Sequence, residues 1–208
     1  QQIAFARNFG PLETTIKAIR KDAKLRLPAE IADVSNLDHE AKRWTEQSRH
    51  RRFEAANKLW HTDSSFKRVP AKASLLYQRS IAPVGGHTEF ADMRAAYDAL
   101  DDATKQRLRG LVANHSIKYS RAQLGFDEYS EDEDIALQPV PQVMVRRHPD
   151  SGRMTLYLAS HAGHIYGMPD DEAKPLIRRL IEHATQRQFI YSHRWRLHDL
   201  VMWDNRCV

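Results

Sequence analysis

The sequence of 208 residues contains one cysteine, Cys207, and therefore cannot form an internal disulfide. That composition suits a reducing compartment, and we expect the protein in the cytoplasm. No apolar run approaches the roughly 20 residues that cross a bilayer, so we expect no membrane span. Neither G-x-G-x-x-G nor G-x-x-x-x-G-K-[ST] occurs, which leaves dinucleotide- and nucleotide-binding folds without support.

The charge is positive overall but unevenly placed, with a formal net charge of +5 and a pI of about 9.4. Basic residues cluster over residues 17–26 and 49–52, whereas residues 128–134 (EYSEDED) are acidic. No helix-turn-helix, zinc-finger or RNP-like pattern accompanies the basic clusters, so we expect no nucleic-acid partner. The excess charge suits attraction of a small anionic substrate.

The length and the 41% hydrophobic share predict one domain over residues 1–208. Strands are expected over residues 30–34, 72–82, 142–147 and 154–159, with two more around a turn at 197–199. Helices are expected over residues 3–9, after Asp92, near Asp101 and after Pro169. Strands joined by turns, with helices grouped between them, predict a mainly β fold with helical insertions. A β-sandwich or jelly roll fits better than a doubly wound sheet.

The chemically informative pattern is H-x-D/E, which supplies two of the three protein ligands of a non-haem iron(II) oxygenase. In extended backbone, residues two apart point to the same side, so both ligand atoms can converge on one ion. The pattern occurs three times, as His61-Thr-Asp63, His87-Thr-Glu89 and His148-Pro-Asp150.

Sequence context separates these three pairs. His148 and Asp150 fall in an expected hairpin turn and are interpreted as turn formers at the surface. His87-Thr-Glu89 follows paired glycines where a strand restarts, and is a weaker candidate. His61 and Asp63 lie between Trp60 and Phe66, which would exclude water from a metal site. On spacing alone, a capping aspartate near a hydrogen-bonded histidine stays an alternative.

Four ordered motifs make the sequence similar to a known family. They are QQIAFARNFGPLE, NKLWHTDSSF, GGHTEFADMRAAYDAL and HATQRQFIYSHRWRLHDLVMWDNRCV. Together they resemble the 2-oxoglutarate-dependent dioxygenases of the taurine dioxygenase superfamily, most closely the 2,4-dichlorophenoxyacetate (aryloxyalkanoate) dioxygenase branch. The resemblance implies a double-stranded β-helix (jelly roll), incomplete at both ends, with Fe(II) and 2-oxoglutarate as cofactor and cosubstrate.

The resemblance also implies roles for particular residues. His61 and Asp63 match the first two iron ligands, and Thr88 matches a threonine whose hydroxyl binds the distal carboxylate of 2-oxoglutarate. Trp195 matches a tryptophan that lines the 2-oxoglutarate site, although a core aromatic on an inner strand is an equal alternative. Asn57 matches a position that faces the primary substrate.

The sequence departs from the family pattern at three places. His87 stands where the family has Asp or Gly, and we expect it not to be a ligand. The third iron ligand, a histidine shortly after the WDNR motif, and the later arginines that anchor 2-oxoglutarate and substrate are expected beyond Val208. We therefore expect an internal fragment that is itself inactive. Four other histidines are expected to be structural or substrate-side groups rather than substitute ligands: His161, His164, His193 and His198.

The function implied is hydroxylation of the carbon next to the ether oxygen of an aryloxyalkanoate. The expected products are a phenol, an oxo-acid, succinate and CO2. Expected partners are a small anionic organic substrate, 2-oxoglutarate and dioxygen, with neither nucleic acid nor membrane, and a homo-oligomer is possible. The alternatives are oxygenation of another small acid, such as a sulfonate or alkyl sulfate ester, and a catalytically dead binding module of the same fold.

Overall fold

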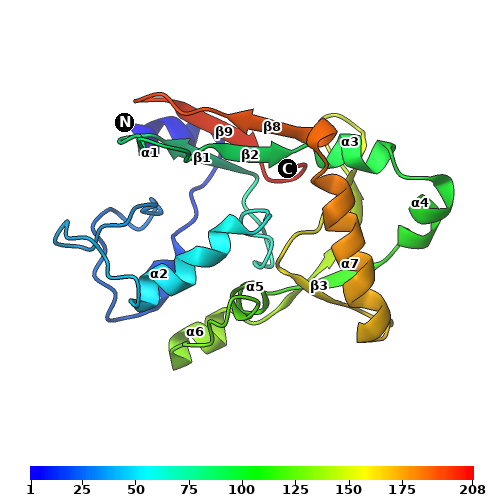
Figure 1. The fold of residues 1–208 in the computed structure, drawn as a ribbon, viewed down its shortest axis with the longest axis horizontal. Helices are drawn as coiled ribbons and strands as arrows, with labels where there is room; N and C mark the ends of the chain where they lie inside the picture. The colour runs from blue at the N-terminus through cyan, green and yellow to red at the C-terminus, as the bar shows by residue number, and fades with distance from the viewer.

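The computed structural model describes all residues from Gln1 to Val208. Nine strands form four small antiparallel sheets. The pairs are β1 (Ala73–Tyr77) with β9 (Leu200–Asp204), β2 (Thr88–Ala91) with β8 (Ile190–His193), β3 (Val112–His115) with both β4 (Val140–Val143) and β7 (Ala162–Ile165), and β5 (Val145–Arg147) with β6 (Met154–Leu156). Figure 1 shows β1, β9, β8 and β2 together along one side of the molecule.

Helices surround these sheets. The α-helices are α1 (Gln2–Ala6), α2 (Arg49–Glu54), α3 (Met93–Asp98), α4 (Asp102–Leu108), α5 (Ile117–Ala122), α6 (Glu131–Ala136) and α7 (Asp170–Ala184), and 3-10 turns cover Arg7–Phe9, Ile16–Ile19, Ala55–Lys58 and Arg187–Phe189. Asp92 begins α3 because its carboxylate accepts from the N–H groups of Arg94 and Ala95. None of the helices combines the length and the apolar character that crossing a membrane requires.

The main core lies between α3, α7 and the strands β3, β6 and β7. The helix α7 buries Leu176, Ile177 and Leu180 on one face, as its sequence pattern predicts. In Figure 1 this helix begins on the side of β3 and ends near the β2–β8 layer, and so joins the two groups of strands. A smaller cluster of Phe53, Ile117, Phe126 and Leu137 packs α2 against α5 and the segment before β4.

Several predicted elements are confirmed, including the first helix, the helices after Asp92 and Asp101, and the hairpin of residues 142–159. That hairpin is interrupted at Met144. The Met144 side chain is buried, and its N–H donates to the Leu111 carbonyl. The chain therefore changes partner there, so β4 pairs with β3 and β5 with β6.

One predicted strand is wrong. Residues 30–34 begin with a turn and a bend and continue without regular structure, since the Arg26 guanidinium binds the Asp33 carboxylate locally and no neighbouring strand is present. The two strands expected around a turn at residues 197–199 are confirmed as β8 and β9, and each pairs with a strand more than 90 residues earlier. Helices and small sheets are mixed and no closed barrel forms within residues 1–208, so the mainly β description holds only in part.

Candidate metal and cosubstrate site

His61 and Asp63 meet at a cleft that is also lined by residues of β2, β9 and α7. They lie on the segment that leads from the 3-10 turn Ala55–Lys58 toward β1. The His61 Nε2 atom is 3.4 Å from Asp63 Oδ1. The cleft has a volume of about 100 Å³, and its lining includes Trp60, Thr62, Thr88, Phe90, Trp203 and Val208. The side chains that sequence spacing placed on one side therefore do share a cavity.

The other atom of each side chain is already bound within the protein. His61 Nδ1 is 2.8 Å from the Leu59 carbonyl oxygen, which can only accept, so Nδ1 carries a hydrogen and Nε2 faces the cleft. Asp63 Oδ2 accepts from Ser74 Oγ at 2.7 Å. A metal ion would therefore meet Nε2 and Oδ1. Two ligands at right angles, with bonds of about 2.1 Å, lie about 3 Å apart, so the observed separation fits one ion.

His61 and Asp63 shift each other's pKa in opposite directions, and each shift favours the charged form. Burial alone would lower the pKa of His61, but the hydrogen bond and the negative charge of Asp63 outweigh it and raise that pKa. Burial would likewise raise the pKa of Asp63, but the bonds from His61 and Ser74 outweigh it and lower that pKa. An incoming cation must displace the proton shared by the pair, and it then takes over the proton's role of balancing the carboxylate.

Thr88 and Trp195 form a second unit at the same cleft. Trp195 is 8% exposed, and its Nε1–H donates to Thr88 Oγ1 at 2.9 Å. Thr88 itself lines the cleft. Because the hydroxyl accepts from the indole, its own hydrogen is free to donate to an anionic ligand. The structure thus gives Thr88 an orientation that suits the predicted contact with a carboxylate, and puts Trp195 behind it.

Asn57 does not line this cleft, although it was predicted to face the substrate. Its Oδ1 accepts from Arg121 Nη2 at 2.8 Å, and its Nδ2 donates to Glu54 at 2.5 Å. Arg121 is 4% exposed and forms no ion pair. Its guanidinium lies 4.7 Å from the Phe53 ring centroid. Sequence analysis did not single out Arg121, because the residues around it in the sequence do not distinguish a buried arginine from an exposed one.

The remaining histidines lie outside the His61–Asp63 pair. His161 is buried, bonds Ser120 and packs its ring 6.1 Å from that of His61, centroid to centroid. His164 bonds Asp170, His193 bonds Asp199 and His198 bonds Tyr77. The side chain of His87 is exposed.

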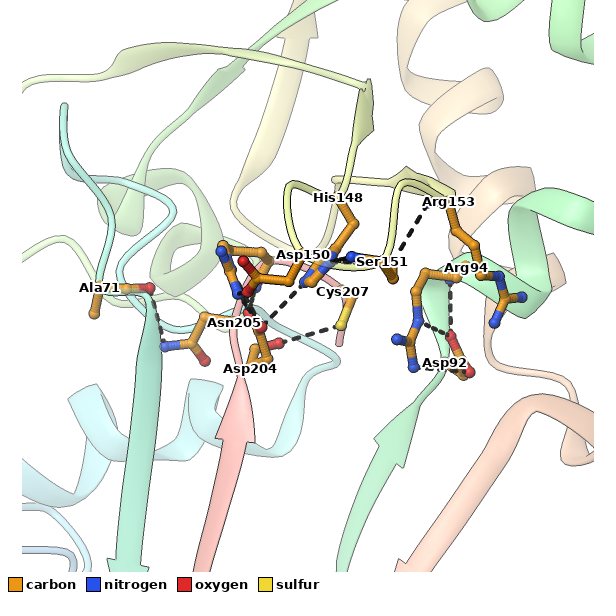
Figure 2. A network of polar contacts seen from close by, with 11 residues as sticks. Ala71, Asp92, Arg94, His148, Asp150, Ser151, Arg153, Asp204, Asn205 and Cys207 are labelled. Carbon is orange, nitrogen blue, oxygen red and sulfur yellow. Dashed lines mark hydrogen bonds and ion pairs between the residues drawn. The ribbon is translucent and has the colours of Figure 1, made fainter. Parts of the chain in front are cut away.

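The prediction that His148 is a surface turn residue is wrong in one respect. Its ring does accept from the Ser151 N–H in the turn, but the residue is buried and its Nε2–H donates to Asp204 at 3.1 Å. His148, Asp204 and Cys207 are the one set of three His, Cys, Asp or Glu side chains whose ligand atoms lie within 4.8 Å of one another. Arg206, which binds Asp204 at 2.6 Å, already supplies a cation there, so this network is structural (Figure 2).

Comparison with known proteins gives the class of this chain. The model of the taurine catabolism dioxygenase TauD, TfdA family matches residues 1–208. The chain belongs to this family, and it is an enzyme of the dioxygenase class; the resemblance inferred from its motifs is confirmed.

Individual relatives are similar along the whole chain. Alpha-ketoglutarate-dependent 2,4-dichlorophenoxyacetate dioxygenase of Cupriavidus pinatubonensis is 48% identical over 209 residues, which are 100% of this chain and 72% of the relative. (S)-phenoxypropionate/alpha-ketoglutarate-dioxygenase of Sphingobium herbicidovorans is 39% identical, over 100% of this chain and 70% of the relative. The crystal structure of AAD-2 in complex with Mn(II) and N-oxalylglycine matches with a TM-score of 0.94 and 52% identity, covering 99% of this chain and 72% of that one.

Proposed function

We propose that this protein is an Fe(II)- and 2-oxoglutarate-dependent dioxygenase that cleaves aryloxyalkanoates such as 2,4-dichlorophenoxyacetate. The observation that carries the proposal is the His61 Nε2–Asp63 Oδ1 pair, 3.4 Å apart at a cleft, in a chain 48% identical to a dioxygenase named for that substrate. Its four sheets would form part of a double-stranded β-helix, with residues 1–208 in a single domain.

Three residues would bind the cofactor and cosubstrate. His61 and Asp63 would hold Fe(II), and Thr88, oriented by Trp195, would donate to a carboxylate of 2-oxoglutarate. Within residues 1–208, no third His, Cys, Asp or Glu side chain joins the pair in a group whose ligand atoms all lie within 4.8 Å of one another. The remaining ligand would come from outside these residues. Val208 already lines the cleft, and its carbonyl accepts from the Thr62 hydroxyl at 2.9 Å.

Held by His61 and Asp63, Fe(II) with 2-oxoglutarate and dioxygen would supply the oxidising power, with one oxygen atom going to succinate and the other to the carbon beside the ether oxygen. The hydroxylated product would then separate into a phenol and an oxo-acid. The protein's part is to fix the two donor atoms and to keep the reacting carbon dry. The cleft wall contributed by Trp60, Phe90 and Trp203 is aromatic, which suits a dry site and contact with an aromatic substrate.

The test measures phenol and succinate release from 2,4-dichlorophenoxyacetate with Fe(II), 2-oxoglutarate and air. It uses this chain and the longer polypeptide of its gene, where the gene continues past Val208. His61→Ala and Asp63→Ala should abolish turnover, whereas His164→Ala, at an exposed histidine bonded to Asp170, should not. Unchanged turnover in His61→Ala would refute the metal assignment.

A sulfonate and an alkyl sulfate ester belong in the same assay. A relative named alkylsulfatase, from Acinetobacter baylyi, is 31% identical over 71% of this chain and 49% of its own length. Faster release of succinate with either compound than with 2,4-dichlorophenoxyacetate would change the proposed substrate class, whereas the proposed dioxygenase reaction would stand. Absence of any substrate-dependent succinate, together with intact metal binding, would indicate a binding module.

A further inference from the structure

The Asp63 carboxylate is supported from behind by two polar side chains. Ser74, on β1, donates from Oγ to Asp63 Oδ2 at 2.7 Å. Asn205 directly follows β9, is 1% exposed, and donates from Nδ2 to Ser74 Oγ at 2.9 Å. Asn205, Ser74 and Asp63 therefore form a continuous relay that ends on the candidate metal ligand.

The direction of hydrogen-bond donation along the relay is fixed at Asn205, the residue farthest from Asp63. The same Nδ2 group lies 3.3 Å from the Ala71 carbonyl oxygen, which has no hydrogen to offer, so the group that faces it must be the amide N–H (Figure 2). Since Ser74 Oγ accepts from Asn205, its own hydrogen is directed to Asp63 Oδ2. That oxygen is thereby occupied, whereas Oδ1 is free to face His61 and the cleft.

Asn205 is itself held in place by its two neighbours in the sequence. Asp204 accepts from His148 at 3.1 Å and from Arg206 at 2.6 Å, and Arg206 also reaches Asp150 at 2.5 Å. Burial alone would raise the pKa of Asp204, but the hydrogen bonds and positive charge of the Arg206 guanidinium have the larger effect and hold that pKa well below its usual range. These bonds fasten the end of β9 to the β5–β6 turn, so the relay starts from a fixed point.

We propose that Ser74 and Asn205 are positioning residues that restrict Asp63 to binding the metal through Oδ1 alone. The inference rests on the proposed function, because it concerns how that metal is held. Without the Ser74 hydroxyl, the carboxylate can rotate and present either oxygen or both. Its orientation then has to be fixed when the ion binds, and the affinity falls.

The experiment titrates Mn(II) into the full polypeptide of the gene without 2-oxoglutarate, by calorimetry. Ser74→Val and Ser74→Thr have the same branched shape, which a strand accepts, and differ only in the hydroxyl. Ser74→Val should weaken Mn(II) binding by about 10- to 100-fold, the range found when a group behind a metal ligand is removed. Ser74→Thr should bind within about twofold of the parent, as should the control Ser192→Val on β8, whose hydroxyl makes no hydrogen bond.

A second comparison tests the link between the two residues. Asn205→Ala should weaken Mn(II) binding by about fivefold alone and cause no further loss in the Ser74→Val background, because the relay is already broken there. Additive losses would show that Asn205 acts through packing and would overturn its assignment. Circular dichroism checks each fold, and Ser74→Ala replaces Ser74→Val if the latter does not fold.

The two proposals fail in different ways. If Asp63→Ala abolishes Mn(II) binding but Ser74→Val binds like the parent, the relay is refuted and the metal site stands. If Asp63→Ala binds Mn(II) as tightly as the parent, or the parent binds none, the proposed function fails and the relay fails with it.

Discussion

His115 should make the stability of this protein depend on pH. It lies at the end of β3, is 0% exposed, stacks on Tyr157 with ring centroids 5.7 Å apart, and has no hydrogen-bond partner at either ring nitrogen. Burial, assisted by the positive charge of Arg146, lowers its pKa from 6.5 to about 4. The unfolded chain therefore binds a proton more readily than the folded protein between these values.

The sign and size of the effect follow from that difference. A folded-state pKa below the unfolded value means that stability is complete above about pH 6.5 and is lost as the pH falls toward 4. Linkage gives a loss of about 2 kcal/mol from His115 between about pH 7.5 and pH 5. The pKa of His161 is also lowered, by burial first, and adds to this loss, whereas the raised pKa of His61 opposes it.

His115→Phe isolates the His115 contribution. Phenylalanine keeps the stacking on Tyr157 and cannot be protonated, so the variant should lose about 2 kcal/mol less than the parent over the same pH range. Urea unfolding followed by tryptophan fluorescence, at several pH values, gives the free energies of unfolding. The exposed His87 provides the control, since His87→Phe should keep the parent's pH profile. Parallel profiles for the parent and His115→Phe would refute the reasoning.

Three further substitutions test other parts of the structure. Trp195→Phe removes the donor to Thr88 and should weaken 2-oxoglutarate binding to the iron-loaded protein about fivefold; an unchanged dissociation constant would contradict the role of the indole. Gly163→Ala would place a methyl carbon 2.7 Å from the Tyr119 ring and should lower the free energy of unfolding by about 1–3 kcal/mol in urea denaturation. An unchanged midpoint of unfolding would contradict this steric conflict. Ser130→Ala removes the cap of α6 and should cost about 1 kcal/mol in the same assay, whereas no loss would mean that the cap is already satisfied by water.

Local patterns in the sequence predict local structure well here. Asp92 caps α3, and Pro169 precedes α7, as their residue types indicate. The helix α6 was not predicted, although Ser130 and Glu133 form the S-x-x-E pattern of a capping box. The capping-box pattern lies within the acidic residues 128–134, which the sequence analysis interpreted only by their charge.

The rest of the site depends on pairings between distant segments. The register of β1 on β9 places Ser74 opposite Trp203, so that Asn205, the residue after β9, reaches Ser74, which in turn binds Asp63. Residues 74 and 205 are 131 positions apart, and no local propensity specifies their contact. Spacing could bring His61 and Asp63 together, because two residues of extended backbone suffice, but it could not show what holds them.

The bond between the Thr62 hydroxyl and the Val208 carbonyl also bears on how the protein folds. It spans 146 positions, and together with the Ser74–Asn205 bond it joins the segment carrying His61 and Asp63 to the last strand. Loops of that length close slowly, so the two donors acquire their final geometry only once nearly the whole polypeptide has collapsed. Affinity for a divalent cation would then appear late in refolding, and would serve as a reporter of the completed native state.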